Sequence, residues 1–425
     1  MKTPLPDYLA RLLAQCDSGD GGQLADYIPE LAQADPHKMA IAICTTDGVV
    51  YAAGDTDYEF TIQSISKPFA YALALREHGL DAVLRKVGVE PSGEAFNELS
   101  LDERTERPLN PMINAGAITT HALLPGSPGA GRAQALQALL ERMTGRSLQV
   151  DEAVYNSELE TAFRNLSLAY MLRNVGAVQG DVSEIVAGYT RQCAIKVNVQ
   201  DLARMAGILA NQGRCPRTRE QLFDRKLVRQ VLSVMTSCGM YNGAGDWLSR
   251  VGIPAKSGVA GGILGALPGQ FGVAVFSPKL DEAGNSVRGV RMMERLSGDM
   301  GLHVMEALPT ARASLRNPEV QVRADIDLYE LQGDIHFAQG ELLLRNLQDR
   351  GQRLGPVILD VSRVIELNAI GGRLLVDAVA HMQQEGVWVG LVDPGQLLQQ
   401  GINAKSLRVN TFSQLQTAIE AACRQ

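Results

Sequence analysis

This sequence lacks the residue patterns that mark most metal sites and most membrane proteins. Its six cysteines form no C-x-x-C pair, and its six histidines form no H-x-x-x-H or H-E-x-x-H cluster. No stretch approaches the ~18 consecutive apolar residues of a membrane span, and the N-terminus has no uninterrupted apolar core of the kind found in signal peptides. Scattered cysteines in apolar contexts are typical of free thiols in a reducing compartment, so we expect a cytoplasmic protein.

The chain also lacks an excess of basic charge. It has 40 lysines and arginines against 47 aspartates and glutamates, which gives a net charge of −7 and a pI near 5.5. Without a basic stripe, broad binding to nucleic acid or to an anionic membrane is not expected. The 45% hydrophobic and 20% charged content is ordinary for a globular protein, and 425 residues exceed the usual size of a single core. We therefore expect about two or three domains.

The most informative feature present is Ser64-Ile-Ser-Lys67, followed at once by Pro68 and by an apolar stretch that ends at Gly79. A serine and a lysine three residues apart share one face at the start of a helix, where the positive end of the helix lies beside the hydroxyl and its candidate base. Pro68 suits a first helical turn and Gly79 suits a helix end, so the pattern predicts a helix over 64–78. A four-residue motif with two fixed positions is weak evidence of catalysis by itself.

A second motif stands in the order that serine–lysine acyl enzymes require. These enzymes usually add a later strand with Lys-(Ser/Thr)-Gly, which lines the opposite wall of the pocket and presents backbone N–H groups to an oxyanion. Lys256-Ser257-Gly258 fits this pattern and is followed by Val259-Ala-Gly-Gly-Ile263. Penicillin-binding proteins and class A β-lactamases also carry Ser-Asp-Asn, or a Ser-x-Asn or Tyr-x-Asn variant, between the two motifs. We find none here, which argues against a β-lactam substrate.

Further segments occur in a fixed order and together point to one family. They span about residues 20 to 265 and comprise Gly22–Leu31, Gln63–Lys67, Asn110–Ala117, Tyr155–Glu158, Arg164-Asn165, Gly188-Tyr189, Gly239–Gly245 and Lys256–Gly262. This set resembles the bacterial-type serine-dependent glutaminases, which are relatives of the β-lactamases adapted to a small amino acid. The resemblance implies an α+β fold, with a β-lactamase/transpeptidase-like sheet and a helical subdomain over residues 1–308.

The resemblance also implies which residues carry the chemistry. Ser64 would be the nucleophile and Lys67 the base that takes its proton, for which the pKa of Lys67 must fall through burial and the helix N-terminus. The backbone N–H of Val259, with that of Ser64, would form the oxyanion hole. Tyr27 and Tyr241 match tyrosines near the nucleophile, where a phenol can pass a proton to departing ammonia. Which tyrosine does so stays open.

Substrate recognition falls, by the same resemblance, on one carboxylate and several neutral groups. The carboxylate is Glu158, which would pair with the substrate ammonium, and the neutral partners are Asn114, Asn165 and Tyr189, beside Ser64, Tyr241 and Val259. Glu158 and Asn165 are seven residues apart in a helical pattern over 157–174. We therefore expect them two turns apart on one stripe of a single helix.

The implied reaction is hydrolysis of L-glutamine to L-glutamate and ammonia through a γ-glutamyl ester on Ser64, with no metal or organic cofactor. Family members of this kind are expected to form homodimers or homotetramers. Two alternatives remain open. A β-lactam or D-amino-acid peptide hydrolase would share Ser64 and Lys67, and a signalling scaffold would carry a catalytically dead first domain. The intact Tyr27, Tyr241 and oxyanion segment speak against the scaffold.

The remaining patterns predict how the first domain is built. Alternating apolar residues around a Thr-Thr-Asp-Gly turn predict a strand hairpin over 38–54. Helices are expected at 132–143 and at 200–212, the latter capped by Asn198 and closed by Gly213. Strands are expected at 250–256, 261–267 and 270–276. A sheet made from both ends of the segment, with helices inserted between, fits the β-lactamase-like architecture.

After a linker-like stretch at 307–318, strands and helices alternate on a short period, which predicts a small α/β domain over 319–425. Val357–Gly371 resembles the strand, loop and helix of STAS domains. Switchable STAS proteins carry an acidic residue and a phosphorylatable serine there, where this chain has Asn368-Ala-Ile, so we expect no phosphorylation. Two roles remain open for this domain: binding a partner protein or small ligand, or serving as a folded appendage for packing and oligomer contacts.

Overall fold

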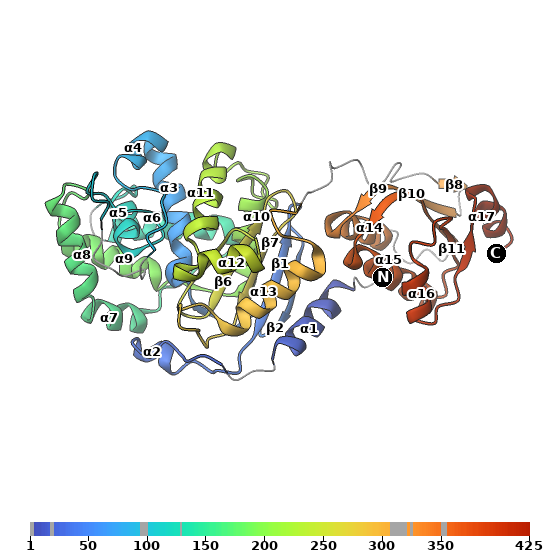
Figure 1. Cartoon of the computed structure of the whole chain (residues 1–425), viewed down its shortest axis with the longest axis horizontal. Coiled ribbons are helices and arrows are strands. Elements are labelled where there is room, and N and C mark those ends of the chain that lie inside the picture. Colours follow the sequence, from blue (N-terminus) through green and yellow to red (C-terminus); the bar gives the residue numbers. More distant parts are fainter. Residues whose placement is uncertain are drawn as a thin grey trace. The chain divides into compact units, whose positions relative to one another are not determined.

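The computed structural model describes residues 4–17, 21–93, 101–127, 130–306, 321–323, 326–349 and 355–425. The chain is of mixed α/β class and divides into two compact units (Figure 1). The large unit is Leu9–Arg295, and the C-terminal unit is Leu296–Gln425 together with the N-terminal residues up to Tyr8. No helix in the described part of the chain is long and apolar enough to cross a membrane.

The centre of the large unit is an antiparallel sheet with the strand order β2-β1-β7-β6-β5. The strands are β1 (Ala40–Thr45), β2 (Val50–Gly54), β5 (Ala255–Ser257), β6 (Gly262–Leu267) and β7 (Phe271–Phe276). The predicted hairpin is therefore confirmed, and the sheet does join segments from both ends of the unit. Strands β1, β6 and β7 are buried along their whole length because helices cover both of their faces.

Period-two alternation decides which helix each strand residue meets. Ala42, Leu264 and Ala274 belong to the core cluster that includes helix α10 (Val199–Ala210). The alternate residue Gly265 instead faces Met293 of helix α13 (Val287–Met300). Helix α10 lies so close to β7 that a Cβ atom at Gly272 would overlap the backbone of α10. Asn198 caps α10 through a capping box, as predicted.

A helical layer lies between β2 and β5 in the sequence. Its helices are α3 (Lys67–His78), α4 (Leu80–Leu84), α5 (Asn114–Ala122), α6 (Ala130–Thr144), α7 (Glu152–Glu160), α8 (Phe163–Asn174), α9 (Val182–Cys193), α10, α11 (Arg225–Cys238) and α12 (Ala244–Arg250). Part of this layer has a core of its own, which α5, α8 and α9 form from residues such as Ile118, Leu168 and Val186. The Ser64–Lys67 motif leads into this layer, and the Lys256–Gly262 segment follows it.

Two predicted elements are confirmed only in part. The single helix over 157–174 is two helices, because the non-helical backbone of Thr161 and Ala162 separates α7, which ends at Glu160, from α8, which begins at Phe163. Glu158 and Asn165 therefore belong to different helices. The predicted strand at 250–256 is confirmed only over its last residues, because Arg250 still belongs to α12 and β5 begins at Ala255.

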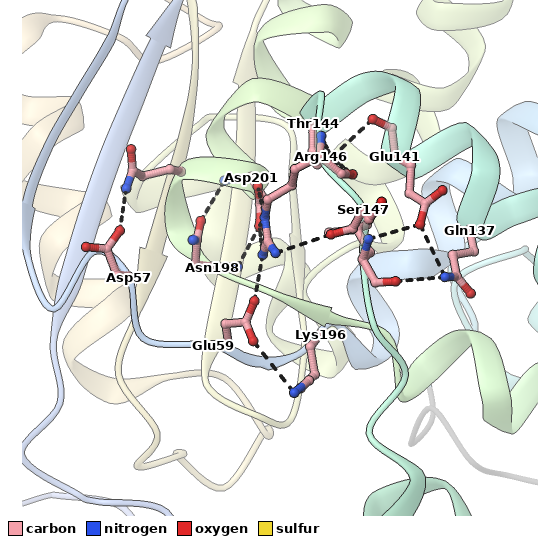
Figure 2. Close-up of polar contacts among 12 residues, drawn as sticks. Asp57, Glu59, Gln137, Glu141, Thr144, Arg146, Ser147, Lys196, Asn198 and Asp201 are labelled. Atoms are coloured by element: carbon pink, nitrogen blue, oxygen red, sulfur yellow. Dashed lines mark hydrogen bonds and ion pairs between the residues drawn. The ribbon is translucent and has the colours of Figure 1, made fainter.

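Strand β3 (Phe60–Thr61), which pairs with β4 (Lys196–Val197), leads directly into the Ser64–Lys67 motif. Figure 2 shows how charged side chains fix this pair. Arg146 donates to both carboxylate oxygens of Asp201, with Nη2 2.6 Å from Oδ2, and the same nitrogen lies 2.9 Å from Oε1 of Glu59. Glu59 also pairs with Lys196 at 3.7 Å. This network joins the ends of α6 and α10 to β3–β4.

The C-terminal unit contains a sheet with the order β12-β11-β10-β9-β8, parallel except for the edge pair β8–β9. Its elements are β8 (Gln321–Arg323), β9 (Ile326–Ile335), α14 (Phe337–Asp349), β10 (Val357–Leu367), α15 (Ala369–Gln384), β11 (Val389–Val392), α16 (Gln399–Ala404), β12 (Asn410–Phe412) and α17 (Leu415–Ala422). The predicted alternation of strand and helix is confirmed, although α16 and β12 were missed. The predicted linker at 307–318 lies outside the described residues.

Candidate active site

An open cavity of about 250 Å³ in the large unit brings together residues that lie far apart in the sequence. Seven of the nine predicted site residues line it, namely Tyr27, Ser64, Asn114, Glu158, Asn165, Tyr189 and Val259. The other two do not line the cavity, but Lys67 contacts Asn114 and Tyr241 contacts Ser64. The cavity is also lined by Ile28, Gln63, Thr161, Ala162, Arg164 and Cys193.

Ser64 lies in a 3₁₀ turn, Gln63–Ser66, that runs directly into α3. The predicted helix over 64–78 is thus helical throughout, but its first turn is tighter than an α-helix. Pro68 stands in the first turn of α3 and Gly79 follows its end with a φ of 78°, as the sequence indicated. Ser64 is 7% exposed, at the cavity wall, and its hydroxyl hydrogen-bonds the phenol of Tyr241.

Lys67 is completely buried. Its Nζ donates to the Met112 carbonyl at 3.0 Å and to Oδ1 of Asn114 at 2.8 Å, and both of these acceptors are neutral. Burial disfavours the charged ammonium and lowers the pKa of Lys67 to about 8. A minority of the amine is therefore neutral near physiological pH, and the neutral form is the state that a general base requires.

Tyr241 begins a second 3₁₀ turn, Tyr241–Gly243, and has a φ of 53°, a left-handed conformation that is uncommon outside glycine. Its phenol donates to the Ser257 carbonyl at 3.2 Å. Lys256 lies over the ring, with Nζ 4.2 Å from the ring centroid, and donates to the carbonyls of Gly239 and Ser257. Burial raises the pKa of Tyr241, so the phenol keeps its proton. Tyr27, by contrast, is 57% exposed at the cavity.

Three neutral side chains form a connected group on one wall. Oδ1 of Asn114 accepts from the Tyr189 hydroxyl at 3.3 Å as well as from Lys67, and Nδ2 of Asn114 donates to Oδ1 of Asn165 at 3.1 Å. They come from α5, α9 and α8, the helices that share a core. The orientation of Asn114 is therefore fixed by three partners at once.

Glu158 supplies the carboxylate of the cavity. Its Oε1 accepts from Nε2 of Gln63 at 2.6 Å. Burial raises the pKa of Glu158 to about 7, although the Gln63 hydrogen bond opposes this shift by favouring the carboxylate. The group can therefore change its charge close to neutral pH.

Val259 lies in the turn between β5 and β6, and it lines the cavity together with Ser64. The turn is closed by a hydrogen bond from the Gly258 N–H to the Gly262 carbonyl at 2.9 Å. Gly261 has a φ of 102°, which only glycine adopts easily. This backbone lies against the Gln63–Ser66 turn, because a Cβ atom at Gly258 would meet Ile65 and the Ile62 carbonyl.

The comparisons with known proteins agree on one family. The family model Glutaminase matches residues 22–305. A glutaminase of Corynebacterium efficiens is 46% identical over 397 residues, which cover 93% of this chain and 93% of that protein. This chain belongs to the glutaminase family.

Solved structures agree with this assignment. The crystal structure of Mglu is 48% identical, covers 94% of this glutaminase and 100% of that chain, and has a TM-score of 0.71. The structure of a probable glutaminase from Bacillus subtilis, complexed with 6-diazo-5-oxo-L-norleucine, is 33% identical, covers 72% of this chain and 98% of that chain, and has a TM-score of 0.66.

Several residues of the cavity have no role that the sequence motifs of this glutaminase predict. Gln63 was part of a matched segment, but its contact with Glu158 is visible only in the structure. Arg164 was likewise quoted only as part of a motif. Cys193 lines the cavity, and burial raises the pKa of its thiol to about 12, so it is a neutral wall group rather than a nucleophile. Nothing in the sequence around Cys193 signalled this position.

Proposed function

We propose that Ser64 carries the glutaminase reaction as a covalent nucleophile and that Lys67 is its base. The reaction itself is the hydrolysis of L-glutamine to L-glutamate and ammonia, which the family match and the 46% identical relative support. The observation that carries the mechanism is the buried Lys67, whose pKa of about 8 suits a base, three residues from a serine at the cavity wall. A serine hydroxyl needs such an acceptor because its own pKa is high.

The proposed sequence of steps uses only groups of this chain. Neutral Lys67 takes the proton of Ser64, and Oγ attacks the side-chain amide carbon of glutamine. The tetrahedral oxyanion is held by the backbone N–H groups of Ser64 and Val259. The C–N bond then breaks, and ammonia leaves with a proton that Tyr241 passes on from Lys67. Water attacks the γ-glutamyl ester by the reverse path and releases glutamate.

Tyr241 is the better candidate for this proton transfer than Tyr27. It hydrogen-bonds Ser64 and donates to the Ser257 carbonyl, beside the oxyanion segment. Tyr27 is more than half exposed, a position that suits a residue closing over the bound substrate. We therefore assign the relay to Tyr241 and a binding role to Tyr27.

Glutamine presents an ammonium and a carboxylate besides its amide, and the cavity offers partners for each. Glu158 is proposed to pair with the ammonium, because it is the carboxylate of the cavity lining. Asn114, Asn165 and Tyr189 are proposed to hold the remaining polar groups through their amides and phenol. The alternatives of a β-lactam or D-amino-acid peptide hydrolase and of an inactive scaffold are not favoured by the glutaminase relatives.

The deciding experiment is intact-protein and peptide mass spectrometry of the enzyme quenched during turnover of glutamine. A γ-glutamyl adduct on the peptide that contains Ser64 is expected. An adduct on another residue, or none in an enzyme that releases ammonia with a measurable burst, would refute the covalent role of Ser64. A chromogenic β-lactam incubated in parallel should remain intact.

We also propose the finer assignments that the sequence suggested for the two parts of the chain. Residues 1–308 would form a β-lactamase/transpeptidase-like catalytic domain, and residues 319–425 a STAS-like domain. Asn368 supports the second assignment, because it begins α15 after a parallel strand and accepts from the Gly371 N–H at 2.7 Å. An asparagine cap there leaves no hydroxyl to phosphorylate. Light scattering on the purified chain tests the proposed homodimer or homotetramer, and fractionation tests the cytoplasmic location.

A further inference from the structure

A chain of buried hydrogen bonds lies behind the nucleophile and is not part of the cavity lining. It starts at His121 of α5, continues through Gln192 of α9 and reaches Ser66 of the 3₁₀ turn Gln63–Ser66, which we call the nucleophile turn. All three side chains are 0% exposed. Nδ1 of His121 lies 2.7 Å from Oε1 of Gln192, and Nε2 of Gln192 donates to Oγ of Ser66 at 3.1 Å. Ser66 then donates to the carbonyl of Gln63 at 2.7 Å.

Every donor of this hydrogen-bond chain points from His121 towards Gln63. The Gln192 amide donates to Ser66, so its oxygen faces His121, and the proton of a neutral imidazole must therefore lie on Nδ1. Burial lowers the pKa of His121 to about 4, which keeps the ring neutral. Successive bonds that share one direction polarise each other, and this strengthens the last bond, to the Gln63 carbonyl.

Stability alone does not explain these polar groups. Nε2 of His121 is buried without a hydrogen-bond partner among the described residues, which costs roughly 1–3 kcal/mol. Apolar residues of the same shape could fill this space between α5 and α9 at a similar or lower cost. The hydrogen-bond chain is therefore better explained by a role in positioning Gln63, the residue at its end.

The hydrogen-bond chain ends at Gln63, a strained residue that connects to the site in two ways. Gln63 has a φ of 50°, a left-handed conformation that costs a residue with a side chain roughly 1–2 kcal/mol. Ser64 follows it directly, so the peptide orientation at Gln63 decides where the nucleophile points. The side chain of the same residue donates to Glu158 at 2.6 Å. Strain of this kind persists only where surrounding contacts enforce it.

We propose that Ser66 and Gln192 are positioning residues that hold Gln63 in its left-handed conformation and thereby fix both Ser64 and Glu158. Neither side chain lines the cavity, so both act through Gln63. The inference rests on the proposed role of Ser64. In this proposal, buried hydrogen bonds from α5 and α9 hold the nucleophile turn in the conformation that the reaction requires.

A double-mutant cycle tests this proposal. Ser66→Ala and Gln192→Met each interrupt the chain, and each should lower kcat for glutamine by about 10- to 100-fold, the scale expected when a reacting group is displaced by about 1 Å. Because both variants break the same chain, the double variant should be no slower than the slower single variant. Losses that multiply in the double variant would overturn the proposal.

The matched control is Thr119→Val, which removes a buried hydrogen bond of α5, from Thr119 to the Ala115 carbonyl at 2.9 Å, that does not reach Gln63. Its kcat should stay within about twofold of wild type, even where its melting temperature falls as far as that of Ser66→Ala. An equal loss of kcat in Thr119→Val would contradict the proposal, since any missing buried bond would then have the same effect.

The proposal can still be tested if one variant does not fold, and its failure can be told apart from a failure of the glutaminase reaction. If Gln192→Met does not fold, Ser66→Ala decides alone, and a kcat within about twofold of wild type overturns the proposal. Wild-type protein that releases no ammonia from glutamine would contradict the glutaminase reaction itself. Wild-type turnover with multiplying losses contradicts only the positioning role.

Discussion

The large unit contains two groups of charged side chains that the fold treats in opposite ways. At the cavity, Lys67 and Glu158 meet neutral amides and carbonyls, and burial shifts the pKa of each toward its neutral form. In the network of Figure 2, Arg146 meets Asp201 and Glu59, and the hydrogen bonds that Arg146 donates to the Asp201 carboxylate raise the pKa of Arg146 further. Opposite charges keep the network charged and hold elements together, whereas neutral surroundings leave the cavity groups able to exchange protons.

The comparison predicts a clear division of effects. Substitutions in the cavity should change activity strongly and stability little, and substitutions in the network should do the reverse.

Ser64→Ala should lower kcat for glutamine by at least ~10³-fold, because it deletes the proposed covalent nucleophile. Thermal unfolding should be close to wild type, since only one hydroxyl at the cavity wall is lost. Ammonia release and calorimetry measure the two quantities. Ser167→Ala, which removes an exposed hydroxyl on α8, is the control and should keep full activity. Comparable turnover in Ser64→Ala would refute the mechanism.

Lys67→Met should lower kcat/KM by about 10²- to 10⁴-fold, the range for loss of a general base. In the wild-type enzyme, kcat/KM should rise with pH and level off above a pKa of about 8, because Lys67 acts only after it has lost its proton. The pH–rate profile measures this. A profile that is flat through pH 8 would show that another group is the base.

Glu158→Gln should raise KM for glutamine by roughly 10- to 100-fold, because an ammonium loses its charged partner. In wild type, KM should rise as pH falls through about 7, since Glu158 then becomes neutral, and the variant should lack this rise. Labelling of Ser64 by 6-diazo-5-oxo-L-norleucine at high concentration should persist. An unchanged KM in the variant would remove Glu158 from substrate binding.

Arg146→Met should keep kcat within about twofold but lower the free energy of unfolding by ~1–3 kcal/mol, because the buried Asp201 carboxylate loses its charged donor. Arg250→Met is the matched control, since Arg250 pairs with Glu294 and Asp246 at the surface and should contribute less than ~1 kcal/mol. Denaturant titration compares the two. A clear fall in kcat of Arg146→Met with little change in its free energy of unfolding would contradict the distinction between the cavity groups and the network groups.

Local signals in the sequence predicted local structure well. Pro68 and Gly79 bound α3, Asn198 caps α10, and the hairpin around the Thr-Thr-Asp-Gly turn forms as expected. Each of these depends on residues a few positions apart. The gap between α7 and α8 was missed, because the non-helical backbone of Thr161 and Ala162 interrupts a pattern that otherwise looks continuously helical.

The candidate site shows where such reasoning stops. Its residue types and their order were available from the motifs, and seven of the nine predicted residues line one cavity. Three features were not available: the left-handed Gln63, the chain from His121 to Ser66, and the pair of Arg146 with Asp201. They depend on contacts between residues 55 or more positions apart, with no fixed spacing to detect.

The position of β1 between β2 and β7 has a consequence for biosynthesis. At about 5–20 residues per second, a ribosome needs roughly 10–45 s to extend the chain from the end of β1 at Thr45 to the start of β7 at Phe271. During that interval the apolar Ala40–Thr45 strand has an unpaired edge, which invites association with other nascent chains. We therefore expect this edge to be a site of incorrect strand pairing while the protein is being made.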